Sequence, residues 1–281
     1  MKINFLIKLI PFFLVFFYSH LKAETVFFNS KNVKIEAEGN MIFATQGTAD
    51  IPSKNLKIKG EKFVYDRLNS ELTIFDKVKY LDKENGLIIE GQKLVYNDLK
   101  NTVISKNETF IKLDNKYDIY SSDVLYDRNL NKITSNELTE VNDRVENNFI
   151  FKQGLIFDTF EEIVSSNEVK ITDQNLNKYF FKNSKLNLKL NEIVGKEIKV
   201  DFIDSFFGNE NNDPILKGRS VLFNNETTRI YKTVFSTCNK KNKNCRGWEV
   251  QSEVFTHDKI RKLFEYENMW LKVFNKKIFY I

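Results

Sequence analysis

The chain has 281 residues and a formal net charge of +5, from 43 basic and 38 acidic side chains. Hydrophobic residues make up 42% of the chain and aromatic residues 14%, which excludes a disordered polyelectrolyte and allows a sizeable core. The one dense basic run, at 240–246, is typical of a solvated turn, so we expect no nucleic-acid partner.

The first 23 residues predict a secretory signal peptide. Lys2 and Lys8 precede an apolar run at 9–18, and Leu21-Lys22-Ala23 suits cleavage before Glu24. Ten apolar residues are too few to span a bilayer, and the alternative interpretation is a retained N-terminal anchor. Loss of this leader removes three lysines and lowers the net charge from +5 to +2. We therefore expect an exported protein of nearly balanced charge.

A repeated triplet of an apolar, an aromatic and an Asx residue organises the next part of the chain. Each copy is followed by polar turn residues, because Asx side chains bond nearby backbone donors and suit the end of a strand. A period near 30 residues with two strands per unit predicts a stack of hairpin-like layers. The copies, spaced by 31, 30 and 31 residues, are Val64-Tyr65-Asp66, Val95-Tyr96-Asn97, Leu125-Tyr126-Asp127 and Ile156-Phe157-Asp158.

Apolar and polar residues alternate with period two within these units. In 186–190 three leucines alternate with Asn187 and Lys189, and 198–202 has the same pattern. Such alternation is typical of antiparallel sheets with one dry and one wet face, and it argues against helices. We therefore predict an all-β fold, either a two-sheet sandwich or a rolled, V-shaped sheet with its dry face inside.

The dry face is either a packed core or the lining of a lipid groove. Aromatic side chains at strand spacing serve both purposes, because burying their rings stabilises any β-sandwich. If the repeats are in register, the residues expected to point inward are Phe63, Tyr65, Ile74, Val78, Leu94, Tyr96, Ile104, Phe110, Val124, Tyr126, Leu155 and Phe157.

The two cysteines, Cys238 and Cys245, predict a local disulfide, because an oxidising compartment preserves such bonds. Zinc is the alternative, but two thiols with the distant His257 do not complete four ligands, so we expect no metal site.

The motifs of an enzyme are missing from the sequence. It has no nucleophile elbow, no glycine-rich phosphate loop and no pair of histidines in the mature chain. Two carboxylate pairs, Glu161-Glu162 and Asp201-Asp204, have the residue types of a glycosidase, but adjacent residues on a strand point to opposite faces. We therefore expect neither catalysis nor a cofactor.

The stretch 233–281 resembles the LptD (OstA) family of lipopolysaccharide-assembly proteins, at the passage from their periplasmic domain to their outer-membrane barrel. Ser236 and Lys277 depart mildly from the family pattern, and the family continues for several hundred residues of barrel after the position of Ile281. The residues that carry the resemblance are Phe235, Thr237, Cys238, Cys245, Trp248, His257, Asp258, Phe279 and Tyr280.

This resemblance implies a particular form of the fold and a function. Residues 24–235 would form an OstA-like periplasmic β-jellyroll, a stack of antiparallel layers with an open-sided groove. Residues 236–281 would lead to the start of an outer-membrane barrel that the chain lacks. The implied function is to accept lipopolysaccharide in an apolar β-groove and pass it to the outer membrane of a Gram-negative bacterium. In the family, the cysteine that matches Cys238 bonds to a barrel cysteine, which implies exchange of the local disulfide in a longer chain.

The resemblance also implies partners. An LptA-like bridge would add a strand to the N-terminal edge near 25–38, and an LptE-like lipoprotein would be used if a barrel follows. The alternative is a free-standing, LptA-like bridge or scaffold that assembles edge to edge, although bridges of that kind lack the tail at 248–280. Within this tail, 259–274 is either an interfacial helix or further strands, and its aromatic and β-branched residues favour strands.

Overall fold

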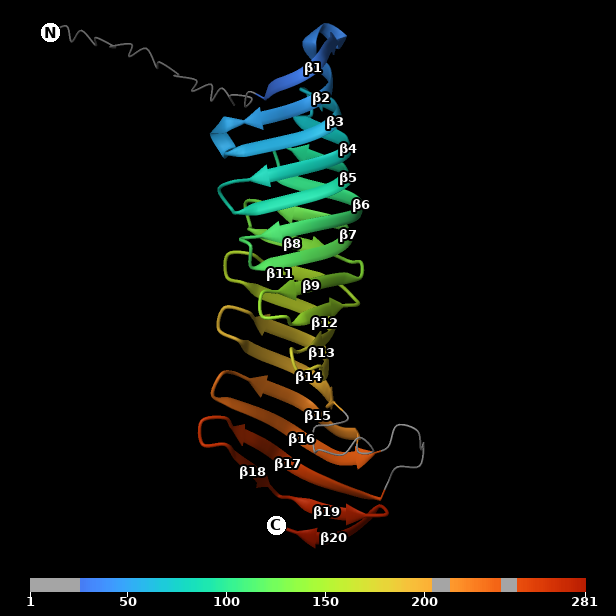
Figure 1. Ribbon diagram of the computed structural model, residues 1–281, viewed down its shortest axis with the longest axis vertical. Helices are drawn as coiled ribbons and strands as arrows, with labels where there is room; N and C mark the ends of the chain where they lie inside the picture. Colours follow the sequence, from blue (N-terminus) through green and yellow to red (C-terminus); the bar gives the residue numbers. More distant parts are fainter. Residues whose placement is uncertain (1–25, 204–212, 239–246) are drawn as a thin grey trace, which may run out of the picture.

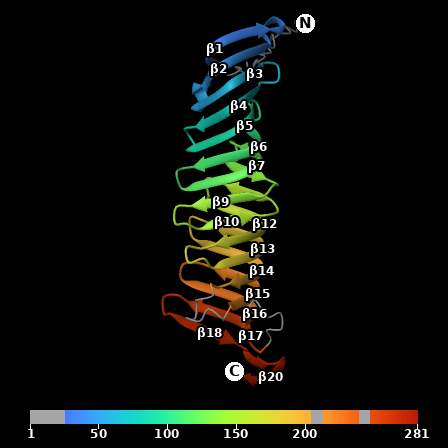
Figure 2. The ribbon, with the colours of Figure 1, turned by 45° about the vertical axis from the view of Figure 1, so that its right-hand side comes forward.

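The computed structural model describes residues 26–203, 213–238 and 247–281, so the predicted signal peptide lies outside the described part. Twenty strands of this part form a single sheet in which all neighbours are antiparallel. The prediction of an all-β fold is confirmed. Figures 1 and 2 show the strands stacked along the long axis, with β1 and β20 at opposite ends.

The first part of the stack consists of long strands with two short 3₁₀ turns between them. Its elements are β1 (Phe27–Glu36), η1 (Ala37–Gly39), β2 (Met41–Ile51), η2 (Pro52–Lys54), β3 (Leu56–Asp66), β4 (Glu71–Asp82), β5 (Leu87–Asn97), β6 (Thr102–Leu113) and β7 (Tyr117–Asp127). Neither of these turns, nor any other helical segment within the described ranges, has the length and hydropathy to cross a bilayer.

The second part mixes long strands with short ones. Its elements are β8 (Lys132–Ser135), β9 (Thr139–Asp143), β10 (Asn148–Phe151), β11 (Leu155–Asp158), β12 (Ile163–Thr172), β13 (Lys178–Asn187), β14 (Glu192–Asp201), β15 (Asp213–Phe223), β16 (Thr227–Cys238), β17 (Trp248–Asp258), β18 (Leu263–Glu267), β19 (Trp270–Val273) and β20 (Lys276–Tyr280). The tail at 259–274 thus contains β18 and β19 and not a helix.

Short strands act in pairs as one layer. The two halves of β7 pair with β8 and β9, and the two halves of β12 pair with β11 and β10. In the same way, β17 pairs with both β18 and β19. The backbone pairing between strands therefore continues through every described layer, although some layers consist of two short strands with a break between them.

The repeated Asx residues end strands as expected. The side chain of Asp66 accepts hydrogen bonds from the backbone N–H groups of Leu68 and Asn69. Asn97 and Asp127 accept equivalent bonds in the next two turns on this side of the stack. These Asx turns reverse the chain after each outgoing strand, which explains the period near 30 residues.

A bend interrupts nearly every long strand at its middle. The pairing register shifts there, for example between Phe75 and Val78 in β4, and residues with positive φ mark the same places. Asp76, Asn107 and Asp123 have φ of 61°, 67° and 51°. Bulges of this kind bend a strand sharply, and Asx residues tolerate the left-handed conformation better than most.

The bend folds each strand so that its two ends approach each other. Lys54 lies before β3 and Asp98 lies after β5, at opposite ends of two strands that are separated by β4, yet their Nζ and Oδ1 atoms are 2.7 Å apart. A straight strand of 11 residues, the length of β5, would hold these ends about 36 Å apart. The folded strands therefore form two arms that face each other, with a bend on one side and an open mouth on the other.

Three polar contacts join the arms across this mouth, and we call them the latches. They are the pairs Lys54–Asp98, Arg128–Asp82 and Lys116–Glu162. The central latch is buried, since the side chains of Arg128 and Asp82 are 4% and 0% exposed. Its guanidinium donates to both oxygens of Asp82, at 2.6 and 3.2 Å. Burial lowers the pKa of Arg128, but the bond to Asp82 outweighs it, and the pKa is raised overall.

We expect Arg128→Met to lower the free energy of unfolding by about 3–5 kcal/mol, because it leaves Asp82 buried without its cation. The control is Arg144→Met, which breaks an exposed pair with Asp118 and should cost at most about 1 kcal/mol. Urea unfolding followed by circular dichroism measures both. Equal costs for the two variants would contradict a buried, structural latch.

The latch nearest the C-terminus, Lys116–Glu162, should make the stability of the protein depend on pH. Burial raises the pKa of Glu162, but hydrogen bonds from Lys116 and Tyr117 outweigh it and lower the pKa below its ordinary value of 4.5. The latch therefore stabilises the fold above that pH, and the stabilisation is lost as the pH falls through the lowered value. We expect Glu162→Gln to flatten the acid limb of a stability profile between about pH 5 and pH 3.

Glu161→Gln, in the same turn, is the matched control, because Glu161 has no ion pair among the described residues. If Glu161→Gln flattens the acid limb as much as Glu162→Gln does, the latch is not the cause.

Candidate functional site

Apolar side chains from every layer line up on the inner face of the first arm, and we call this row the Tyr96 ladder. Each member is the direct cross-strand partner of the next, so the rings and aliphatic groups lie one layer apart, about 4.8 Å. In chain order across β3 to β12 the row is Tyr65, Leu72, Tyr96, Val103, Tyr126, Ile133, Phe157 and Val164.

The second arm carries a matching row, the Ile89 ladder. Its side chains are almost completely buried, and each contributes about 2 kcal/mol by leaving water. Across β3 to β10 the row is Ile58, Tyr80, Ile89, Ile111, Ile119, Val141 and Phe149.

The two ladders pack against each other in the N-terminal two thirds of the stack. Tyr80 of one arm lies 6.4 Å, between ring centroids, from Tyr96 of the other. Tyr117 and Phe157 make an edge-to-face contact across the interior at 5.6 Å. Phe28 of β1 contacts Phe63 in the same way. From β2 to β12 the interior is therefore filled by its own side chains.

The interior becomes more open towards the C-terminal layers. The Ile89 ladder continues through Phe235, Val250 and Leu271, which are half-buried, to Phe279, which is 54% exposed. Phe255 contacts the rings of Phe264 and Tyr266, its sheet neighbours in β18. At this end the apolar rows are accessible from solvent.

Most of the residues predicted to face inward do so. Phe63, Tyr65, Ile74, Leu94, Tyr96, Val124, Tyr126, Leu155 and Phe157 are all buried in the first arm, and Val78 is buried just past the bend of β4, in the second arm. Ile104 and Phe110 were predicted to face inward, and this is wrong. Ile104 is exposed, and Phe110 lies opposite Glu90 and Tyr120 on the outer face.

The error in β6 has a local cause. Val103-Ile104 and Phe110-Ile111 are pairs of adjacent apolar residues, so alternation alone allows either phase. The partner strand decides between them, because Val103 pairs with buried Tyr96 and Ile111 pairs with buried Ile89. Val103 and Ile111 therefore point inward, and their neighbours point outward.

The Ile89 ladder and the latches were missed from the sequence. The predicted set followed the Asx triplets, which all lie in the first arm, whereas the second arm begins beyond each bend. The latches do leave a signal, because their partners are 44 to 46 residues apart, about one and a half repeats. A search for opposite charges at that separation would have found them.

Hydroxyl groups lie on the inner side of the mouth, next to the central latch. Tyr126 donates to Asp82 at 3.4 Å, while the buried hydroxyl of Tyr80 has no hydrogen-bond partner among the described residues. Burial, and then the Asp82 carboxylate, raise the pKa of both tyrosines above the usual 10, although Arg128 opposes this. Both groups are therefore neutral donors at physiological pH, and that of Tyr80 is unused.

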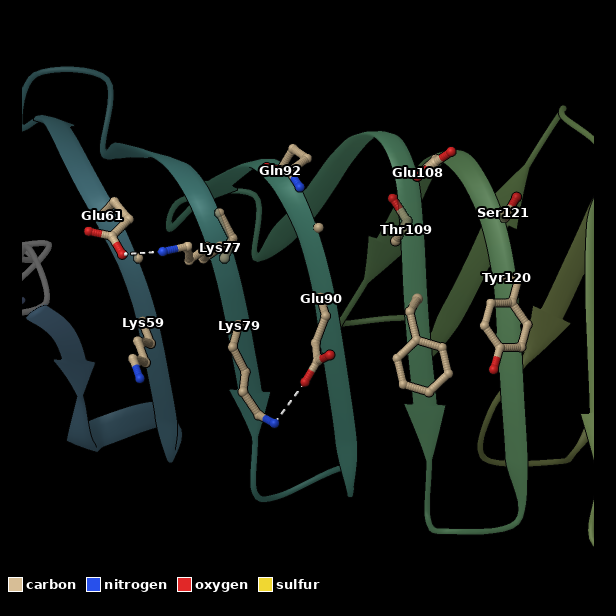
Figure 3. A pocket seen from close by; sticks show the side chains of 14 residues that line it. Lys59, Glu61, Lys77, Lys79, Glu90, Gln92, Glu108, Thr109, Tyr120 and Ser121 are labelled. Atoms are coloured by element: carbon tan, nitrogen blue, oxygen red, sulfur yellow. Dashed lines mark hydrogen bonds and ion pairs between the residues drawn. The ribbon is translucent and has the colours of Figure 1, made fainter. Parts of the chain in front are cut away.

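A shallow pocket of about 920 Å³ lies on the outer face of β3 to β7. Figure 3 shows its charged side chains facing one another, with Lys79 bonded to Glu90 at 2.7 Å and Lys77 to Glu61 at 3.4 Å. Phe110 and Tyr120 form its apolar side, with their ring centroids 5.0 Å apart. Lys59 and Glu108 also line the pocket and have no ion pair among the described residues, but the acidic and basic side chains of its lining balance, so the pocket carries no net charge.

The other predicted sites are only partly within the described part. Cys238 ends β16, but its side chain and the whole of Cys245 lie outside the described residues, as does Asp204. Glu161 and Glu162 lie in a turn and not on a strand, and Glu162 is held in its latch. The described residues contain no cluster of three or more potential metal ligands.

No family model and no curated protein matches the chain. Function must therefore be inferred from the two ladders, the latches and the open C-terminal end of the interior.

Proposed function

We propose that this chain is the periplasmic domain of an LptD-like translocon, which accepts lipopolysaccharide in its apolar interior and passes it to the outer membrane. The observation that supports this most is the continuity of the Ile89 ladder from β3 to β20. A lipid with several acyl chains needs an unbroken apolar path to cross an aqueous space, since each exposed methylene costs about 0.8 kcal/mol. Carriage of this kind requires no catalytic group and no cofactor.

The lipid enters where the latches release, and it leaves at the C-terminal layers, where the apolar rows are already accessible from solvent. When acyl chains replace the ring contacts between the ladders, the side chains of the ladders stay in an apolar environment, so little hydrophobic free energy is lost. The main cost of opening is then the separation of the latch charges. The unused hydroxyl of Tyr80 offers a hydrogen-bond donor to the polar part of a lipid held at the mouth.

The ends of the stack fit the partners that this function requires. β1 pairs with β2 on one side only within the described residues, so its other edge has free backbone groups for an LptA-like bridge. An LptE-like lipoprotein belongs to the same proposal, at the outer-membrane end.

We expect a photo-crosslinking amino acid to capture lipopolysaccharide when it replaces Tyr96 or Phe255, since both residues face the interior. Phe110 is the matched control, an aromatic residue on the outer face of a neighbouring strand. Phe255 is only half-buried, so it tests the idea even if the bulky group at Tyr96 prevents folding.

Each variant is first compared with the unmodified protein by circular dichroism. Capture at Phe110 that equals capture at Phe255 would show binding to the outer surface and would remove the case for an apolar path.

A free-standing bridge that assembles edge to edge is the second candidate. Within the described residues, β1 pairs only with β2 and β20 pairs only with β19, at opposite ends of the stack. These edges favour the second candidate, because one can pair with the other in the next copy. Val33 and Ile35 of β1 are exposed beside this edge. Such assembly would produce filaments whose length increases with concentration.

Proline scanning of β1 tests this second candidate. Successive N–H groups of an edge strand point alternately to the neighbouring strand and to the open side. We therefore expect one of the variants Val33→Pro and Lys34→Pro to block filaments without unfolding the protein, while the other disturbs the pairing with β2. Electron microscopy and sedimentation velocity measure assembly, and filaments from both folded variants would exclude the edge of β1.

A further inference from the structure

The outer face of β12 to β15 gathers lysines that are far apart in the sequence. Lys182 and Lys196 lie at the bend, Lys185 lies next to it on the outer side of the first arm, and Lys170, Lys199 and Lys217 lie on the outer side of the second arm. All six point away from the interior, and we call this convex surface around the bend the basic face. Nothing in the local sequence marks it, because each strand contributes only one or two of the six. Because successive residues of a strand point to opposite sides, this location separates it from the apolar ladders.

Like charges lie directly opposite one another on this face. Lys182 is the cross-strand partner of Lys196, and Lys199 is the partner of Lys217. Directly opposed like charges destabilise a sheet, whereas an opposed Lys–Glu pair, as between Lys79 and Glu90 on β4 and β5, stabilises it. The arrangement is thus unfavourable for folding alone.

The acidic groups nearby do not neutralise the face. Glu197 binds Lys182 and Asp201 binds Lys199, while Glu168 binds Lys152 of the preceding strand. Glu192 remains at the end of β14. Among the described residues, Lys170, Lys185, Lys196 and Lys217 have no ion pair.

Apolar side chains lie between the lysines. Phe180 lies in register between Lys170 and Lys199, and Lys199 lies over its ring at 5.3 Å. Val194 and Leu222 are direct cross-strand partners and are 53% and 46% exposed. Such a surface suits the interface of a membrane. The ammonium groups can bind the phosphates of the lipid headgroups, while the lysine stems and the exposed apolar side chains enter the upper part of the acyl region.

We propose that the basic face docks on a membrane surface that carries anionic phospholipids. The exposed apolar residues favour a membrane over an acidic protein. The ammonium group of lysine is a compact point charge, which is well suited to binding phosphate. This inference goes beyond the proposed function, because it concerns the outer face and not the interior. It holds whether or not the ladders carry lipid.

The test uses the full mature chain and vesicles made of equal parts of phosphatidylcholine and phosphatidylglycerol, at physiological salt. We expect cosedimentation with these vesicles and none with phosphatidylcholine alone. A variant with Lys185→Gln, Lys196→Gln and Lys217→Gln should bind about a hundredfold more weakly, at roughly fivefold per lysine near a charged surface. It should also be no less stable, since Lys217→Gln relieves the repulsion with Lys199.

The matched control removes the same charge from the first layers, with Lys59→Gln and Lys112→Gln on the outer face and Lys83→Gln in the turn after β4. None of these three lysines has an ion pair among the described residues. An equal loss in the control would mean attraction by net charge alone and would overturn the proposal. Binding of polyglutamate with no binding to vesicles would overturn it too, in favour of an acidic protein partner.

Discussion

The bend at the middle of each long strand is the constraint on which the rest of the structure depends. A straight antiparallel sheet with one dry face would leave that face in water or need a second sheet to cover it. Here each strand folds over and covers its own inner face. The left-handed residues at the bends cost about 1 kcal/mol or more each, and the burial of two ladders offsets this.

The same bend decides how the interior can open. A closed barrel has no mouth, whereas two arms joined only at the bend can separate along the opposite side. In this chain, polar latches hold that side together from η2 to the turn before β12, and aromatic rings fill the space behind them. Beyond β16 the rings contact neighbours within an arm, so the resistance to opening decreases along the stack.

The sequence predicts the class of fold well because the controlling signals are local. Alternation of period two and the Asx residues at strand ends both act within a few positions, and the structure has the expected strands and turns. The phase of β6 was wrong because two pairs of adjacent apolar residues, Val103-Ile104 and Phe110-Ile111, make its alternation ambiguous. Only pairing with β5 resolves it, and pairing is a property of two strands.

The candidate site was half predicted for a related reason. The Asx triplets mark the end of the first arm, so residues such as Tyr96 and Tyr126 were found, whereas the Ile89 ladder follows bends that have no fixed sequence. The latches depend on which turns meet after the strands fold. The basic face depends on the register of four strands. The sequence of any one of these strands, taken alone, predicts only an ordinary solvated surface.

The opposed lysines and the opening of the interior occur in neighbouring layers, and the two are physically related. Repulsion between Lys199 and Lys217 weakens the pairing of β14 with β15, and inside the same layers Tyr179 and Ile193 are only half-buried. Anions bound outside would remove that repulsion and tighten the ladder without touching the latches. If both proposals hold, docking on a membrane stiffens the layers next to the proposed lipid exit, because one sheet carries charge on its outer face and the apolar path on its inner face.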